Sequence, residues 1–319
     1  MINKKISNTT FRIVILVLLL YCAAVSSPAC AALRKEKKLN IVTSAFPPYD
    51  FTRSITGDRA EIFMLLKPGS EPHSFDPSPS DIIKIRDCDL FVFAGGESDS
   101  WVNGILESLG ANKKKPEILR LIDSVNALED EFIEGMTSYE EELGYDGHIW
   151  TSPANAKKIV KTLSDTICRL DKKNAKLYQK NTDSEIALID ELDASFRAIV
   201  DGAVRRTIIF ADRFPFRYFT DYYDLNYYAA FPGCSSETDA GALTVSFLIN
   251  KVRSEKIPVV FFVEFSNEKM ADVVISVVPT TKKLLLHSAH NVSKADFDGG
   301  ATYISIMKRN LENLKEALN

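Results

Sequence analysis

Short apolar, β-branched runs alternate with segments of helical periodicity along most of the chain, and this alternation restricts the fold more than any other feature. In the first half, the runs expected to form strands are residues 39–43, 62–66 and 89–96, the last ending in two glycines. In the second half they are residues 207–210, 227–230, 258–263 and 283–286. Strands separated by helices at this spacing indicate parallel sheets covered by helices. The sequence therefore predicts an α/β fold.

A long helix is predicted near the middle of the chain. Residues 174–201 place Tyr178, Ile189, Leu192 and Phe196 at helical spacing, and about 28 helical residues span about 42 Å. We expect this helix to join two α/β lobes, residues 32–173 and 202–319, each a mostly parallel sheet flanked by helices, and to limit hinge motion between them.

The first 31 residues have the pattern of a signal peptide. Lys4, Lys5 and Arg12 precede or flank an apolar run at 13–25, and Ala29-Cys30-Ala31 resembles a cleavage site. The run is short for a transmembrane helix. We therefore expect export to the periplasm or to the outer face of the cell membrane. Lipidation at Cys22 or Cys30 is left open.

Composition excludes some partners and leaves the cysteine chemistry open. The net charge of −4 and the short basic clusters do not indicate a nucleic-acid partner, and we expect a monomer. Beyond the signal peptide, Cys88, Cys168 and Cys234 could form one disulfide at most. Their scattered spacing favours small buried thiols.

The usual catalytic motifs are absent from the sequence. It contains no H-E-x-x-H, no G-x-S-x-G, no phosphate-binding Walker loop and no G-x-G-x-x-G after a strand. We expect a protein that is not an enzyme.

The histidines give the strongest chemical signal. The chain has four, and His73, His148 and His287 each follow or end a predicted element, in three separate parts of the sequence. His73 lies in a proline-rich loop, 67–81, before a helix that Ser80-Asp81 is expected to cap. Imidazoles that converge from separate loops are typical ligands of Zn²⁺ or a related ion.

Several motifs resemble those of the substrate-binding proteins of zinc and manganese ABC transporters, the ZnuA-like and TroA-like family. They are Glu71-Pro72-His73 followed by 77–81, Gly147-His148-Ile149-Trp150 followed by 153–156, and the closing segment 300–307. The resemblance covers essentially the whole chain beyond the signal peptide. It implies two α/β lobes joined by one long helix, with a metal bound between them.

The resemblance also implies a set of metal ligands. The first two histidine ligands of the family correspond to His73 and His148. The third histidine is missing, and Asp212 lies within one residue of its position; the fourth position corresponds to His287. The alternatives for the fourth ligand are Glu237, Glu264 and His290.

Three histidines favour Zn²⁺ over Mn²⁺, because Mn²⁺ prefers oxygen-rich, higher-coordinate sites. The expected function is capture of the metal outside the cytoplasm and delivery to the membrane permease of an ABC transporter. Two alternatives stay open. One is an exported metal-dependent hydrolase with Asp212 or Glu237 as the base; the other is a metal-free pocket in which Arg213 anchors an organic anion.

Overall fold

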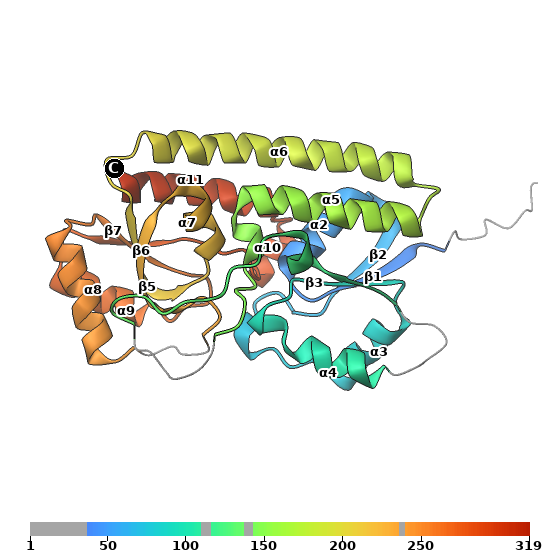
Figure 1. The fold of residues 1–319 in the computed structure, drawn as a ribbon, viewed down its shortest axis with the longest axis horizontal. Helices are drawn as coiled ribbons and strands as arrows, with labels where there is room; N and C mark the ends of the chain where they lie inside the picture. Colours follow the sequence, from blue (N-terminus) through green and yellow to red (C-terminus); the bar gives the residue numbers. More distant parts are fainter. Residues whose placement is uncertain (1–36, 110–115, 137–142, 236–239) are drawn as a thin grey trace, which may run out of the picture. The chain divides into compact units, whose positions relative to one another are not determined.

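The structure is a computed structural model that describes residues 37–109, 116–136, 143–235 and 240–319 (Figure 1). Residues Leu39–Asn319 form one compact unit. The predicted signal peptide, with Cys22 and Cys30, and the candidate ligand Glu237 lie outside the described residues. Within the described ranges, no helix is both long and apolar enough to cross a membrane.

The first sheet has four parallel strands in the order β2-β1-β3-β4. Its elements are β1 (Leu39–Thr43), β2 (Ala60–Met64), β3 (Leu90–Phe93) and β4 (Glu117–Arg120), with α2 (Phe46–Thr56), α3 (Pro79–Asp87), α4 (Trp101–Ser108) and α5 (Pro153–Leu170). The predicted strands are confirmed, although β2 begins and ends two residues earlier than expected and β3 ends at Phe93, before the two glycines. Strand β4 was not predicted, because this short edge strand has only two apolar residues, Ile118 and Leu119, between two charged ones.

The second sheet is also parallel and has the order β6-β5-β7-β8. Its elements are β5 (Thr207–Phe214), β6 (Asn226–Pro232), β7 (Val259–Phe262) and β8 (Lys282–Leu285), with α7 (Arg217–Tyr223), α8 (Ala242–Ser254), α9 (Lys269–Val277), α10 (Lys294–Asp298) and α11 (Tyr303–Leu318). The α/β fold class is therefore confirmed. Strand β5 is longer than expected, so Asp212 lies inside a strand and not in the loop after it.

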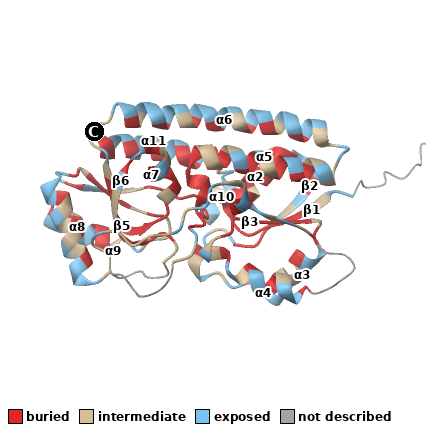
Figure 2. Ribbon diagram, in the orientation of Figure 1, coloured by how far each residue is buried: buried red, intermediate tan, exposed pale blue. Residues whose placement is uncertain are grey.

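The predicted long helix is α6 (Ala175–Asp201). Figure 1 shows it running alongside α5 and α11, and Figure 2 shows that one side of it is buried while the other is exposed. The buried positions follow the helical period: Tyr178, Thr182, Glu185, Ile189, Leu192, Phe196 and Val200.

One continuous hydrophobic core includes buried side chains from both sheets. Its buried side chains include Ile41 and Leu90 from the first sheet and Ile208 and Phe261 from the second. The lobe boundaries at 173 and 202 stay a prediction, because this core continues across them.

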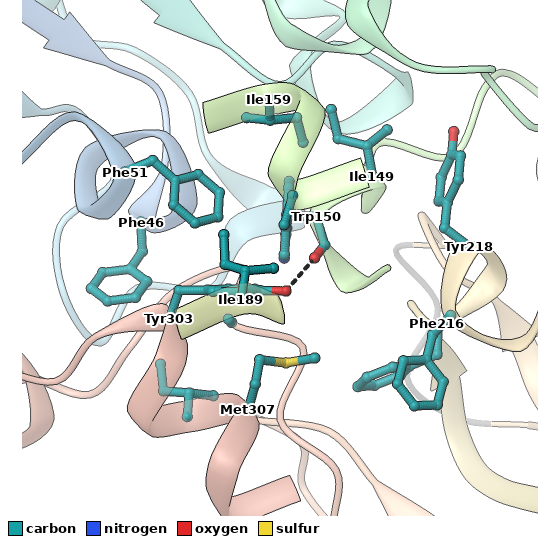
Figure 3. Close-up of a cluster of buried hydrophobic side chains, with 14 of the residues drawn as sticks. Phe46, Phe51, Ile149, Trp150, Ile159, Ile189, Phe216, Tyr218, Tyr303 and Met307 are labelled. Atoms are coloured by element: carbon teal, nitrogen blue, oxygen red, sulfur yellow. Dashed lines mark hydrogen bonds between the residues drawn. The ribbon is translucent and has the colours of Figure 1, made fainter. Parts of the chain in front are cut away.

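At the centre of this core, Trp150 and Tyr303 are both fully enclosed (Figure 3). The Tyr303 hydroxyl donates to the Trp150 carbonyl at 2.9 Å, and Trp150 Nε1 donates to the Ser288 carbonyl at 2.7 Å. These bonds fix α11 and the segment after β8 against residue 150. The segment that contains His148 is therefore held against α11 and the segment after β8.

Two local predictions need correction. Helix α3 is capped by Ser78, with Pro79 at its first position and Asp81 completing a capping box, and not by Ser80. Proline suits this position because its fixed φ is helical and its missing N–H is not needed there. The three described cysteines are free thiols, but only Cys88 is buried; Cys168 and Cys234 are half-buried.

Candidate metal centre

Three histidines converge although they are far apart in the sequence. His73, His148 and His290 each offer a ring nitrogen, and these atoms lie within 4.8 Å of one another. They line a cavity of about 20 Å³, the metal cavity, together with Glu71, Pro72, Arg213, Pro215, Gly233, Val263, Glu264 and Ser288. A volume of this size holds one water or one ion.

The topology explains why these side chains meet. His73 lies in the short 3-10 helix η3 (Pro72–Ser74), in the connection that follows β2, and His290 lies in the segment after β8. His148 precedes the 3-10 helix η6 (Ile149–Thr151) in the connection that follows β4. Ligand groups in open α/β folds gather at the carboxyl ends of parallel strands. The metal cavity therefore lies where the connections from both sheets meet.

Asp146 fixes the His148 imidazole. Asp146 Oδ1 accepts from the His148 backbone N–H at 2.8 Å and lies 2.6 Å from Nδ1, and both residues are buried. Burial lowers the pKa of His148, but the charge of Asp146 and its hydrogen bond outweigh burial and raise this pKa well above its usual value. Since Nδ1 donates to Asp146, Nε2 is the nitrogen left for a metal.

The distance between two of the imidazoles suits zinc. His148 Nε2 lies 3.1 Å from His290 Nδ1. Two nitrogens on one tetrahedral Zn²⁺, each about 2.0–2.1 Å from the metal, are about 3.3 Å apart. A metal could therefore enter between these two rings with little movement of either.

The other two imidazoles are kept neutral. Burial, followed by the positive charges of His148 and Arg213, lowers the pKa of His73 well below its ordinary value. Burial and the charges of His148, His73 and Arg213 lower the pKa of His290 in the same way. Neutral imidazole is the form that binds a metal, so both rings are in the state a ligand requires.

Glu264 shapes the loop that carries His290. Its carboxylate accepts from Ser288 N at 2.8 Å, Ser288 Oγ at 2.5 Å and His290 N at 3.2 Å. Ala289, between them, has a φ of +64°, in the left-handed region that non-glycine residues seldom adopt. The carboxylate thus stabilises a strained turn that directs His290 into the metal cavity.

The structure does not bring Asp212 and His287 into the three-histidine group. Asp212 Oδ1 accepts from Arg213 N at 2.8 Å and Oδ2 from Val263 N at 3.2 Å. His287 Nδ1 accepts from Ala289 N at 3.0 Å. These bonds are local to β5, to the end of β7 and to the turn after β8.

His290, which the sequence offered only as an alternative, lies in the group instead. The sequence signal for it was weak, because it follows the last strand by several residues and stands in a turn with a second histidine.

Cys234 lies close to Ser98 and Asp146, the residues that contact His73 and His148. Its Sγ is 3.7 Å from Ser98 Oγ and 4.0 Å from Asp146 Oδ1, and Ser98 Oγ is 3.3 Å from His73 Nδ1. Asp146, His148 and Cys234 form a second group of mutually close donor atoms. The sequence assigned Cys234 only to the core, since its spacing matches no metal motif.

Comparisons with known proteins identify zinc-uptake and zinc-binding proteins as relatives of this chain. A family model, ZnuA, described as zinc-uptake complex component A, periplasmic, matches residues 41–317. The high-affinity zinc uptake system protein ZnuA of Bacillus subtilis (strain 168) is 31% identical over 295 residues, which are 92% of this chain and 92% of that protein.

Two streptococcal comparisons extend this result. The zinc-binding lipoprotein AdcA of Streptococcus pneumoniae (strain ATCC BAA-255 / R6) is 28% identical over 287 residues, 88% of this chain but 56% of its own length. The crystal structure of the Zn(II)-bound ZnuA-like domain of Streptococcus pneumoniae AdcA aligns with a TM-score of 0.74 and 27% identity, covering 88% of this chain and 99% of that domain.

Proposed function

The chain belongs to the ZnuA family of periplasmic zinc-uptake components, and from this premise we propose that it captures Zn²⁺ outside the cytoplasm for uptake. The metal is cargo: it is bound, carried and released unchanged. Delivery to the permease of an ABC transporter is part of the proposal, as are a monomeric state and a position in the periplasm or at the outer face of the membrane.

The observation that carries the proposal is the convergence of His73, His148 and His290 on one cavity of ionic size. We assign these three residues as metal ligands and Asp146 as the residue that orients His148. Three nitrogen donors suit Zn²⁺ better than Mn²⁺, which favours oxygen ligands and higher coordination.

Asp212 and His287 receive no ligand role in this proposal. Both oxygens of Asp212 accept backbone hydrogen bonds, and His287 Nδ1 accepts one within its own turn. Breaking such a bond and leaving a buried polar atom without a partner lowers the stability of the fold by about 1–3 kcal/mol. Moving either residue to the metal would therefore cost the protein these hydrogen bonds.

The two alternative functions have less support. A zinc hydrolase needs a free carboxylate near an open coordination position. Of the three carboxylates near the histidines, Glu264 is occupied by three donors, Asp146 by His148 and Glu71 by Arg213. An organic anion would need the Arg213 guanidinium, which is already paired with Glu71 at 3.1 Å. We propose neither function.

The test is zinc affinity, measured by competition with a chromophoric chelator, on wild type and four single alanine variants. We expect His73→Ala, His148→Ala and His290→Ala each to weaken zinc binding about 100-fold or more, because each removes a direct ligand. His287→Ala is the matched control and should bind within a few-fold of wild type.

A wild-type protein that takes up no zinc would contradict the proposed function. A loss of affinity in His287→Ala equal to that in His290→Ala would contradict the proposed ligand set.

A further inference from the structure

Three imidazoles leave a tetrahedral zinc ion one ligand short. Among the described residues, the mutually close donor atoms of this group belong to His73, His148 and His290, and no carboxylate is among them. The three ligands are neutral, so the carboxylates that offset the +2 charge of the ion lie outside this ligand set: Asp146, bonded to His148, and Glu264 and Glu71, which line the cavity. Such a charge is costly unless an anionic group compensates it.

Two glutamates line the metal cavity, and their surroundings differ. Glu264 is enclosed, and its carboxylate holds the turn that carries His290. The side chain of Glu71 is 32% exposed, and Oε1 accepts from the backbone N–H of His73 at 3.3 Å. Glu71 stands two residues before a ligand, lines the metal cavity and is only partly enclosed, so its side chain is freer to turn toward the metal than that of Glu264.

Arg213 is the present partner of Glu71. Its Nη1 and Nη2 donate to Glu71 Oε1 at 3.1 Å and Oε2 at 3.5 Å, while Nη1 also donates to the Ser235 carbonyl at 3.4 Å. The register of β5 against β6 shifts between Phe210 and Arg213, an irregularity that redirects side chains at the end of a strand. The Arg213 side chain is only 6% exposed and lines the metal cavity.

A second, larger cavity adjoins the first. It has a volume of about 340 Å³ and shares Glu71, His73 and Arg213 with the metal cavity; its other lining residues are Ser74, Asp212, Phe265, Ser266 and Asn267. The Glu71–Arg213 pair therefore lies at the boundary between the site of the ion and a space large enough for solvent.

We propose that Glu71 supplies the fourth zinc ligand and that Arg213 positions it. One carboxylate oxygen would bind the metal while the other keeps its bond to the guanidinium. A carboxylate can bridge two cations in this way, and its negative charge then offsets the positive charges of the metal and of the buried guanidinium. This inference rests on the proposed function, whose three histidine ligands it completes with one anionic oxygen.

The first test compares Glu71→Gln with Glu61→Gln, a matched control on an exposed position of β2. We expect Glu71→Gln to weaken zinc binding about 10- to 100-fold, and Glu61→Gln to leave it unchanged. Cobalt(II) gives a second readout: the Glu71→Gln complex should acquire a position open to added azide, seen as a change in its visible absorption, whereas the wild-type complex should not. Zinc binding and a cobalt spectrum equal to those of wild type in Glu71→Gln would overturn the proposal.

The second test measures the coupling between the two residues. Arg213→Met should change zinc affinity in the wild-type background but have a much smaller effect in the Glu71→Gln background, because a positioning residue acts through its partner. Arg213→Lys should restore part of the wild-type affinity and the wild-type cobalt spectrum. Equal effects of Arg213→Met in both backgrounds would contradict the positioning role.

The tests distinguish failure of the fourth-ligand proposal from failure of the proposed zinc-binding function. If wild type binds zinc and His148→Ala does not, while Glu71→Gln binds like wild type, only the fourth-ligand proposal fails. Thermal unfolding of each metal-free variant shows whether a loss of binding reflects a loss of fold.

Discussion

Single residues set the chemistry of the metal cavity by deciding which atoms stay free. Asp146 occupies His148 Nδ1 and leaves Nε2 for a metal, while Glu264 holds the turn of His290. Asp146 Oδ2 accepts no hydrogen bond from the described residues, although Asp146 is fully buried. The strong contacts of the orienting carboxylate are therefore those that Oδ1 makes with His148.

The first prediction concerns this carboxylate. Asp146→Asn should weaken zinc binding about 10- to 100-fold, since the amide no longer fixes the imidazole with a full charge. The measurement is chelator competition at constant pH, and Asp190→Asn, an exposed carboxylate on α6, is the control. Unchanged affinity in Asp146→Asn would show that His148 needs no orienting partner.

At the scale of elements, α6 matters because of what its buried face contains. Most of that face is apolar, but Glu185 is only 9% exposed and lies in the contact with α2. Burial, followed by the charge of Asp50 on α2, raises the pKa of Glu185 to about 7. A carboxylate in this position opposes packing of the two helices when it is ionised.

The second prediction follows from the sign of this shift. A folded-state pKa above the unfolded value of 4.5 means that the contribution of Glu185 to stability is fully present below pH 4.5 and is lost as the pH rises through about 7. Glu185→Gln should therefore raise the free energy of unfolding by about 2–3 kcal/mol at pH 8 and have little effect at pH 4.

Urea unfolding at both pH values measures this difference, with Glu191→Gln on the exposed face of α6 as the control. An equal change at both pH values would mean that ionisation of Glu185 does not oppose the packing of α6 on α2.

At the scale of the whole chain from Leu39 to Asn319, the proposed site links the two sheets. His73 comes from a connection of the first sheet and His290 from the segment after the last strand of the second. The shared core and the Trp150–Tyr303 bond already hold these regions together. We therefore expect the loops to adjust to the metal while the sheets keep their arrangement.

The third prediction is that zinc stabilises the folded protein and that its removal reverses the effect. A ligand that binds only the native state adds about 2.7 kcal/mol at a free concentration 100 times its Kd, because the unfolded chain cannot bring the three histidines together. Thermal unfolding with zinc, and again after excess chelator, measures the shift. His148→Ala should show a much smaller shift, and a shift equal to that of wild type in that variant would place the bound zinc elsewhere.

The sequence by itself determined the class of fold and most of the elements, although not strand β4. The β-branched runs and the period of α6 are local signals, and local signals indicate strands and helices before any packing is known. The same holds for His73 and His148, whose motifs lie within a few consecutive residues.

Only the tertiary structure decided which residues of the second half meet these histidines. His287 and His290 are three positions apart, and the turn held by Glu264, with its left-handed Ala289, directs one toward the metal cavity and leaves the other bonded within the turn. Both carboxylate oxygens of Asp212 accept backbone hydrogen bonds, from Arg213 and Val263. The adjacent Arg213 forms an ion pair with Glu71, 142 positions away in the sequence. These outcomes depend on strand register and on long-range hydrogen bonds, which local sequence patterns do not encode.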